Sequence, residues 1–171
     1  VRIIPRLDIK GPDLVKGIHL EGLRVLGDPA EFSEYYFKNG ADEIYYQDIV
    51  ASLYQRSSIY DLLSKVAKKV FIPLTVGGGI RTIEDIRKTL SAGADRVSIN
   101  TAAVHNKKFI TEAVNVFGSS TIVVAIEFSK SENNKYRVFT DNGRQETGLD
   151  AIEWFHQVQE LGAGEVCFTS I

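Results

Sequence analysis

The chain has very little cysteine, no long hydrophobic run and no excess of either sign of charge. Its one cysteine, Cys167, excludes a disulfide within the chain. No apolar run approaches the roughly 20 residues that a membrane-spanning helix needs, and the first residues enter an apolar segment without the charged leader of a signal peptide. The net charge of −2 gives no sign of a nucleic-acid partner. We therefore expect a soluble cytoplasmic domain that binds neither membranes nor nucleic acids.

Strand-like apolar runs alternate with segments of helical periodicity along the whole chain. This alternation is typical of βα units built around a parallel sheet. The glycine pattern of a dinucleotide-binding fold does not follow the first predicted strand, which disfavours an open doubly wound sheet. The predicted strands cover residues 3–9, 43–49, 72–76, 96–100, 122–128 and 165–170.

A short motif recurs where predicted helices end and strands begin. It reads Gly-Ala-Asp-Glu-Ile from Gly40, Gly-Ala-Asp-Arg-Val from Gly93 and Gly-Ala-Gly-Glu-Val from Gly162. Repeated βα units favour an α/β fold of the (β/α)8 TIM-barrel type. A closed barrel typically takes about 250 residues. We therefore expect residues 1–171 to be one barrel domain that covers about the first six βα units and ends before strands seven and eight.

One polar interval, residues 129–148, interrupts the alternation. Within it, residues 136–140 alternate in polarity as a strand does, and Asp141, Asn142 and Gly143 have the composition of a hairpin turn. We expect this interval to be a β-hairpin inserted after the fifth strand.

Two segments predict a site for an anion. Residues 75–80 read Thr-Val-Gly-Gly-Gly-Ile, and residues 98–103 read Ser-Ile-Asn-Thr-Ala-Ala. Glycines leave backbone N–H groups accessible to an anion, and Asn100 and Thr101 would add side-chain donors. If the two segments end neighbouring strands, they can hold a phosphate together. The alternative is that the triple glycine is only a turn from a strand into a helix.

Acidic residues stand at the ends of three predicted strands, at Asp8, Asp48 and Glu127. The carboxyl ends of the strands form the active face of a (β/α) barrel, so two of these carboxylates could act there as acid and base. Each could instead cap a helix or join a salt bridge. No residues have the spacing of metal ligands, and we expect neither a metal nor another cofactor.

Several segments carry a family resemblance. They are residues 3–8, Val-Lys-Gly at 15–17, Gly-Asp-Pro at 27–29, the triple glycine, residues 98–103, Val-Ala-Ile at 124–126 and Gly-Ala-Gly-Glu at 162–165. Over its whole length the chain resembles the cyclase subunit of imidazole glycerol phosphate synthase. The resemblance implies a lyase of histidine biosynthesis that uses ammonia, released from glutamine by a separate glutaminase subunit. Its substrate would be a bis-phosphorylated ribulosyl-formimino aminoimidazole carboxamide ribonucleotide, converted to imidazole glycerol phosphate.

The resemblance also assigns roles to single residues. It makes Asp8 one catalytic carboxylate and puts Glu127 in the place of the second, where the family has aspartate. The additional methylene shifts the reach of that carboxylate by more than about an ångström, and proton transfer depends on such placement. Arg6 is a second departure, because the family commonly has cysteine there. The residues that match the family's first phosphate site and its substrate loop are Gly78, Gly79, Asn100 and Thr101 for the phosphate and Lys16 for the loop.

Charged residues also lie at or near the starts of the predicted strands. In the resembling family these positions gate an ammonia passage and face the glutaminase, so the chain is expected to form a heterodimer with such a subunit. The family's lysine is Arg96 here, and a guanidinium can hold carboxylates bidentately. Solvated surface salt bridges are the alternative. The gate residues are Arg2, Glu43, Arg96 and Glu165, and Asp95 matches a position on the partner face.

Two other functions stay open. The resemblance extends to paralogues of the cyclase that pass ammonia toward the amidation of a bacterial surface sugar, and the departures at Arg6 and Glu127 fit such a paralogue. The other possibility is a phosphate-binding scaffold subunit without catalytic activity.

Overall fold

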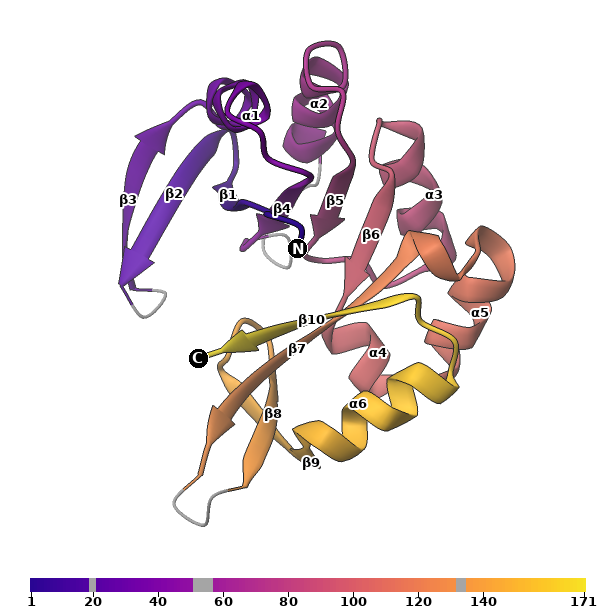
Figure 1. Ribbon diagram of the computed structural model, residues 1–171. Helices are drawn as coiled ribbons and strands as arrows, with labels where there is room; N and C mark the ends of the chain where they lie inside the picture. Colours follow the sequence, from indigo (N-terminus) through magenta and orange to yellow (C-terminus); the bar gives the residue numbers. More distant parts are fainter. Residues whose placement is uncertain (19–20, 51–56, 132–134) are drawn as a thin grey trace. The chain divides into compact units, whose positions relative to one another are not determined.

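Strands and helices alternate along the chain in the computed structural model, which describes residues 1–18, 21–50, 57–131 and 135–171 (Figure 1). The strands are β1 (Arg6–Lys10), β2 (Asp13–Ile18), β3 (Glu21–Gly27), β4 (Ile44–Asp48), β5 (Leu74–Gly77), β6 (Arg96–Ile99), β7 (Ile122–Lys130), β8 (Tyr136–Thr140), β9 (Gln145–Asp150) and β10 (Glu165–Ser170). The helices are α1 (Pro29–Lys38), α2 (Ser57–Val66), α3 (Ile83–Ser91), α4 (Thr101–His105), α5 (Lys108–Phe117) and α6 (Ala151–Glu160), with a 3-10 turn at Ser119–Thr121. This order confirms the α/β class.

The predicted strands are found as β1, β4, β5, β6, β7 and β10, with ends shifted by a few residues. The described residues form two compact units. The first contains residues 1–80 and 84–97, and the second contains residues 81–83 and 98–171.

The sheet of the first unit has the strand order β3-β2-β1-β4-β5. β1, β4 and β5 are parallel, with Arg6 opposite Tyr45 and Ile44 opposite Leu74. β2 and β3 are an antiparallel pair beside β1. This pair is not predicted from the sequence, because a register shift between Leu14 and Val15 buries both residues and removes the alternation that marks a strand.

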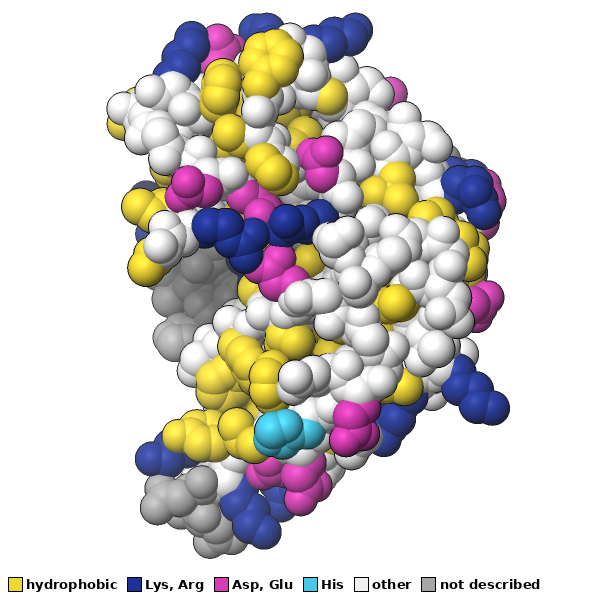
Figure 2. Space-filling model, turned by 45° about the vertical axis from the view of Figure 1, so that its right-hand side comes forward, with side chains coloured by type: hydrophobic (Ala, Val, Ile, Leu, Met, Phe, Trp, Pro, Cys, Tyr) yellow, Lys and Arg dark blue, Asp and Glu magenta, His cyan; other side chains and the backbone are white. Residues whose placement is uncertain are grey.

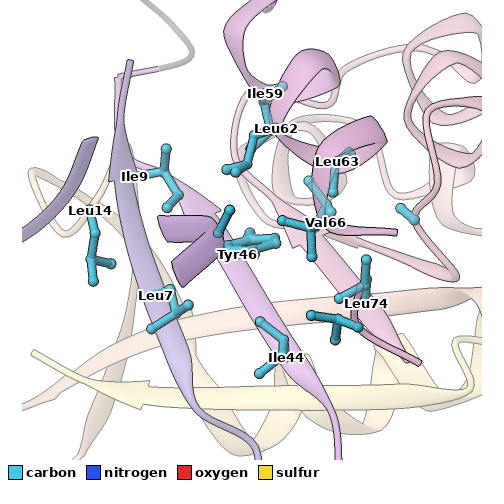
Figure 3. Close-up of a cluster of buried hydrophobic side chains, with 14 residues drawn as sticks. Leu7, Ile9, Leu14, Ile44, Tyr46, Ile59, Leu62, Leu63, Val66 and Leu74 are labelled. Carbon is cyan, nitrogen blue, oxygen red and sulfur yellow. The ribbon is translucent and has the colours of Figure 1, made fainter. Parts of the chain in front are cut away.

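The core of the first unit lies between its sheet and helices α1 and α2. Side chains from β1, β4 and β5 point toward the apolar face of α2 (Figure 3). Full burial of one such side chain contributes about 1.5–3 kcal/mol, so this cluster holds the strands in register beneath the helices. Its members include Leu7, Ile9, Leu14, Ile44, Tyr46, Ile59, Leu62, Leu63, Val66 and Leu74.

Helix α1 begins at Pro29 because Asp28 caps it. One carboxylate oxygen of Asp28 accepts the N–H of Ala30 at 2.8 Å. The other lies 2.6 Å from Nζ of Lys65, on α2. The hydrogen bond from Lys65, and then that from Ala30, hold the pKa of Asp28 below its ordinary value of 3.8. Asp28 therefore joins the two helices that cover the sheet.

Strand β7 is the centre of the second unit. β10 is parallel to β7, with Glu165 opposite Val123, whereas β8 is antiparallel to it, with Phe139 opposite Glu127. β9 pairs with β8, and α6 contacts β7, β8 and β9. This arrangement gives the second unit a mixed sheet with a helix packed on it.

The polar interval 129–148 contains the strands of an antiparallel pair. β8 and β9 are joined by a turn in which Asp141, Asn142 and Gly143 have φ values of 53°, 57° and 77°. Such values suit the Asp-Asn-Gly sequence. β8 also pairs with the end of β7, and β9 continues to Asp150, so the antiparallel region extends past the predicted interval on both sides. Residues 132–134 lie outside the described part of the chain.

Of the helices in the described ranges, none has the length and apolar character needed to cross a bilayer. On the face in Figure 2, Lys and Arg side chains lie among Asp and Glu side chains, with hydrophobic side chains exposed between them. This mixture agrees with the small net charge of the chain.

Candidate active site

Asp8 lies on β1 in an ion pair with Arg6. Nε of Arg6 is 3.0 Å from Oδ1 of Asp8, and the guanidinium carbon lies 5.9 Å from the centre of the Tyr45 ring. Residues two apart on a strand share one face, so the pair is built by β1 itself and supported by its neighbour β4. Arg6, which departs from the resembling family, therefore contacts the predicted catalytic carboxylate.

Asp48 ends β4 on the other face of the sheet. It is opposite Ile9, a core residue, whereas Asp8 is opposite Gln47, and neighbours in register share a face. Oδ1 of Asp48 accepts the N–H of Val50 at 3.0 Å, which closes a local turn. The geometry gives Asp48 a turn-forming role, and its role as a second acid at the mouth stays a prediction.

The triple glycine begins at the end of β5, beside Asp48. A Cβ at Gly78 would lie 2.1 Å from the backbone oxygen of Asp48, and φ at this residue is +97°. Packing therefore requires glycine at position 78 whether or not a phosphate binds. Gly79 also has a positive φ, of 64°.

Asn100 and Thr101 follow β6 and belong to the second unit, whereas Gly78 and Gly79 belong to the first. Their joint phosphate site stays a prediction. The buried side-chain oxygen Oδ1 of Asn100 has no hydrogen-bond partner among the described residues, and because it is an acceptor it needs a donor, which a phosphate anion does not supply. A buried polar atom of this kind is costly unless something else satisfies it.

Glu127 is a buried residue of β7, with 6% of its surface exposed. Its Oε2 accepts the N–H of Gly143, in the turn between β8 and β9, at 2.9 Å. The same turn reaches the residue after Asn100, because the N–H of Asp141 donates to Oγ1 of Thr101 at 3.2 Å. Two predicted site residues are thus brought to one hairpin turn.

Glu43 is the centre of a charged cluster at the start of β4. Its side chain is only 4% exposed, and Oε2 lies 3.2 Å from Nη1 of Arg2 and 3.1 Å from Nη1 of Arg96. The hydroxyl of Thr75 donates to the other oxygen. A buried carboxylate needs such partners to offset its desolvation. Three of the predicted gate residues therefore meet, with Glu43 shared between two guanidinium groups.

Two further predicted residues have local structural contacts. Asp95 is exposed, but Oδ2 accepts the N–H of Leu74 at 2.9 Å and its own N–H donates to the Leu74 carbonyl. Lys16, predicted in a loop, is exposed on strand β2 opposite Arg24. Glu165 starts β10 in the second unit. No observation here tests their roles toward substrate or partner.

Three residues with contacts in these clusters are missed by the sequence analysis as site residues: Thr75, Asp141 and Gly143. A signal existed for Thr75, since it stands in the same segment as the triple glycine. The Asp-Asn-Gly turn is predicted as a turn, but no local pattern reveals which strand end a turn contacts.

Comparisons with known proteins identify the family of the chain. The family described as "Histidine biosynthesis protein" matches residues 2–171. A relative from Legionella pneumophila, "Imidazole glycerol phosphate synthase subunit HisF", is 50% identical over all 171 residues, which span 81% of the relative. The chain therefore belongs to the histidine biosynthesis protein family, and its βα units are part of the (β/α)8 TIM barrel expected from the sequence.

Proposed function

We propose that the chain is the cyclase subunit of an imidazole glycerol phosphate synthase. The observation that carries the proposal is its 50% identity, over its full length, to a relative of that name. The activity is a lyase reaction of histidine biosynthesis in the cytoplasm. Ammonia reacts with the bis-phosphorylated formimino ribonucleotide, and the products are imidazole glycerol phosphate and aminoimidazole carboxamide ribonucleotide.

In this reaction Asp8 and Glu127 transfer protons as acid and base. Gly78, Gly79, Asn100 and Thr101 hold one phosphate of the substrate, and Lys16 contacts the substrate from the β2 strand. Asp48 shapes the active face of the barrel by closing the turn that follows β4.

Ammonia comes from a glutaminase subunit, which forms a heterodimer with the chain. The charged cluster of Arg2, Glu43 and Arg96 supports this assignment. The buried carboxylate of Glu43 is paired with two cations, so the cluster can open for ammonia only if Glu43 exchanges one ion pair for another. Asp95 and Glu165 complete the charged residues at the strand starts and face the partner.

Complementation tests the proposal directly. The full-length gene should restore growth without histidine to a bacterium that lacks its own cyclase subunit, provided that the cognate glutaminase is co-expressed. The purified full-length protein should also form imidazole glycerol phosphate from the synthetic substrate and ammonium salts. Failure of both assays with folded protein would refute the proposed reaction.

A second candidate function rests on the Arg6–Asp8 pair. A guanidinium nitrogen of Arg6 lies 3.0 Å from the predicted catalytic carboxylate, at a position where the resembling family has cysteine. This difference favours an acceptor of ammonia other than the cyclase substrate. The alternative is a paralogue that passes ammonia toward amidation of a bacterial surface sugar. In that case Arg6→Cys should not create cyclase activity, and loss of the gene should alter the surface glycan without causing histidine auxotrophy.

A further inference from the structure

The turn between β8 and β9 is tied to two predicted site residues that are far from it in the sequence. Gly143 donates its N–H to the Glu127 carboxylate at 2.9 Å. Asp141 donates its N–H to the Thr101 hydroxyl at 3.2 Å. The turn is closed by the N–H of Arg144, which donates to the Thr140 carbonyl. Backbone N–H groups of one short turn therefore donate hydrogen bonds to the side chains of both Glu127 and Thr101.

Each contact restricts the side chain in a way that matters chemically. A carboxylate that accepts a backbone N–H is held in one orientation, and charge-assisted hydrogen bonds of this type are short and strong. A threonine oxygen that accepts an N–H keeps its own hydrogen to donate. At Thr101 that hydrogen can be directed to an anionic oxygen of a phosphorylated substrate.

We propose that the turn of the β8–β9 hairpin is a positioning element of the candidate active site, in which Gly143 orients the carboxylate of Glu127 and Asp141 orients the hydroxyl of Thr101. The role in catalysis rests on the proposed function. The contacts themselves can be tested without it.

This proposal accounts for the glutamate at position 127. Glu127 is on β7, opposite Phe139 of β8, and Gly143 lies beyond the end of β8 in the turn. Glutamate carries its carboxylate one methylene farther from the strand than aspartate does, and here that carboxylate ends at the Gly143 N–H. The glutamate that replaces the family's aspartate at position 127 is thus long enough to reach the hairpin turn.

Amide hydrogen exchange on the full-length protein tests the two contacts. Glu127→Asp should speed exchange at Gly143 by about tenfold or more, as expected when a hydrogen bond to a charged acceptor is lost. Thr101→Val should speed exchange at Asp141, and Thr101→Ser, which keeps the hydroxyl, should restore the slow rate. Unchanged exchange at both amides would overturn the proposal.

Kinetics test whether the contacts position the site. Gly143→Ala strains a residue at φ +77° and would place its Cβ 2.8 Å from Cδ1, at the end of the Ile171 side chain, whereas Gly148→Ala controls for the positive φ alone, since Gly148 has φ +75° in the same hairpin with no atom within 4 Å of the added Cβ. In ammonium-dependent turnover, Gly143→Ala should lower kcat by about tenfold in the wild-type background but by less than about twofold in Glu127→Asp. Gly148→Ala should lower kcat equally little in both backgrounds.

An equal effect of Gly143→Ala in both backgrounds would mean that the turn is merely structural, which overturns the positioning role. Absence of turnover in the wild-type protein would refute the proposed function instead. The exchange rates at Gly143 and Asp141 would then still decide whether the turn holds Glu127 and Thr101.

Discussion

Gly78 stands where the ends of β4 and β5 come together in the first unit. Its backbone lies so close to Asp48 that an added Cβ would be 2.1 Å from the Asp48 carbonyl oxygen, and its φ of +97° is unfavourable for other residues. The same close approach brings the glycine N–H groups to the carboxyl end of the sheet, where ligands of barrel enzymes bind. Packing therefore requires glycine at the position that is also predicted to hold a phosphate.

Gly78→Ala should destabilise the protein by about 3 kcal/mol or more, because steric overlap with backbone adds to the cost of a positive φ. Gly40→Ala is the matched control in the same unit. Gly40 has φ +85° with no atom within 4 Å of an added Cβ, so its substitution should cost only about 1–2 kcal/mol. Urea unfolding of both variants measures the difference, and equal losses would contradict the steric argument.

Asp8→Asn should abolish ammonium-dependent turnover while the protein stays folded. Loss of a proton-transfer group typically costs about 10²–10⁴ in rate. The fold should tolerate the change because the Asp8 side chain is 30% exposed and its pair with Arg6 lies on a strand already held by the core. Steady-state kinetics with a circular dichroism melt is the measurement. Turnover within a few-fold of the wild type would remove Asp8 from the mechanism.

At the scale of elements, the recurring motif has a structural meaning. In the first two copies an aspartate exchanges two hydrogen bonds with the start of a neighbouring segment: Asp42 with Ile3, and Asp95 with Leu74. In the third copy the position is Gly164, where a Cβ would lie 2.3 Å from the Ser119 carbonyl oxygen. In the third copy the N–H of Gly164 donates to the carbonyls of Ser119 and Ile122, so each copy ties the start of its strand to a neighbouring segment by hydrogen bonds.

Asp42→Ala and Asp95→Ala should each lower the free energy of unfolding by about 1–3 kcal/mol, the cost of leaving a backbone N–H without its charged acceptor. Asp42→Asn and Asp95→Asn keep an acceptor oxygen and should cost less. Thermal or urea unfolding compares the four variants. If alanine and asparagine are equivalent at both positions, the anchoring role is wrong.

The stability that Asp28 contributes should depend on pH. Lys65 and the Ala30 N–H lower the pKa of Asp28 from its ordinary value of 3.8, so its contribution is present above that value and is lost as the pH falls through the lower pKa of the folded state. Asp28→Asn should flatten the pH dependence of stability below about pH 4 and keep the helix cap. Asp28→Ala should lose about 1 kcal/mol more, because it removes the cap. Urea unfolding at pH 3 and pH 7 is the measurement.

The sequence predicts the strands and helices that alternate as βα units, but it does not predict the antiparallel strands β2 and β3, which lie outside that alternation. The parallel strands are continuous apolar runs with turn signals at their ends, and such patterns are local. β2 and β3 are missed because their register shift hides the period. The first strand is predicted three residues early, because Ile3 and Ile4 are apolar but exposed. Contacts such as Arg6 with Asp8 and Gly143 with Glu127 depend on side-chain reach and on distant segments, so no local pattern contains them.

At the scale of the whole molecule, the proposed activity depends on a second protein. Glu43, held by Arg2 and Arg96, lies at the start of β4, and Asp95 is exposed one residue before Arg96. Among the described residues, Asp95 takes no part in the ion pairs of Glu43, and its carboxylate accepts the Leu74 N–H instead, so a substitution there tests the partner face once the loss of that anchor is controlled. Asp95 is therefore the appropriate place to test docking of the glutaminase.

Asp95→Lys should lower glutamine-dependent turnover by about tenfold or more, because it reverses a charge on the partner face. Ammonium-dependent turnover should stay within about twofold of wild type, since the site chemistry is unchanged. Asp95→Asn controls for the hydrogen bond to Leu74, and Asp42→Ala controls for loss of the same anchor at another strand. Parallel assays with glutamine and with ammonium provide the test. If both activities fall together, the partner role of Asp95 is refuted.

The pairing of parallel strands also bears on how quickly the chain can fold. Arg6 meets Tyr45, Ile44 meets Leu74 and Val123 meets Glu165, so these pairings join residues that are 39, 30 and 42 positions apart in the sequence, and loop-closure entropy changes little over that range. No single pairing is then a much larger entropic barrier than the others. Folding can advance from one βα unit to the next in the order in which a ribosome releases them.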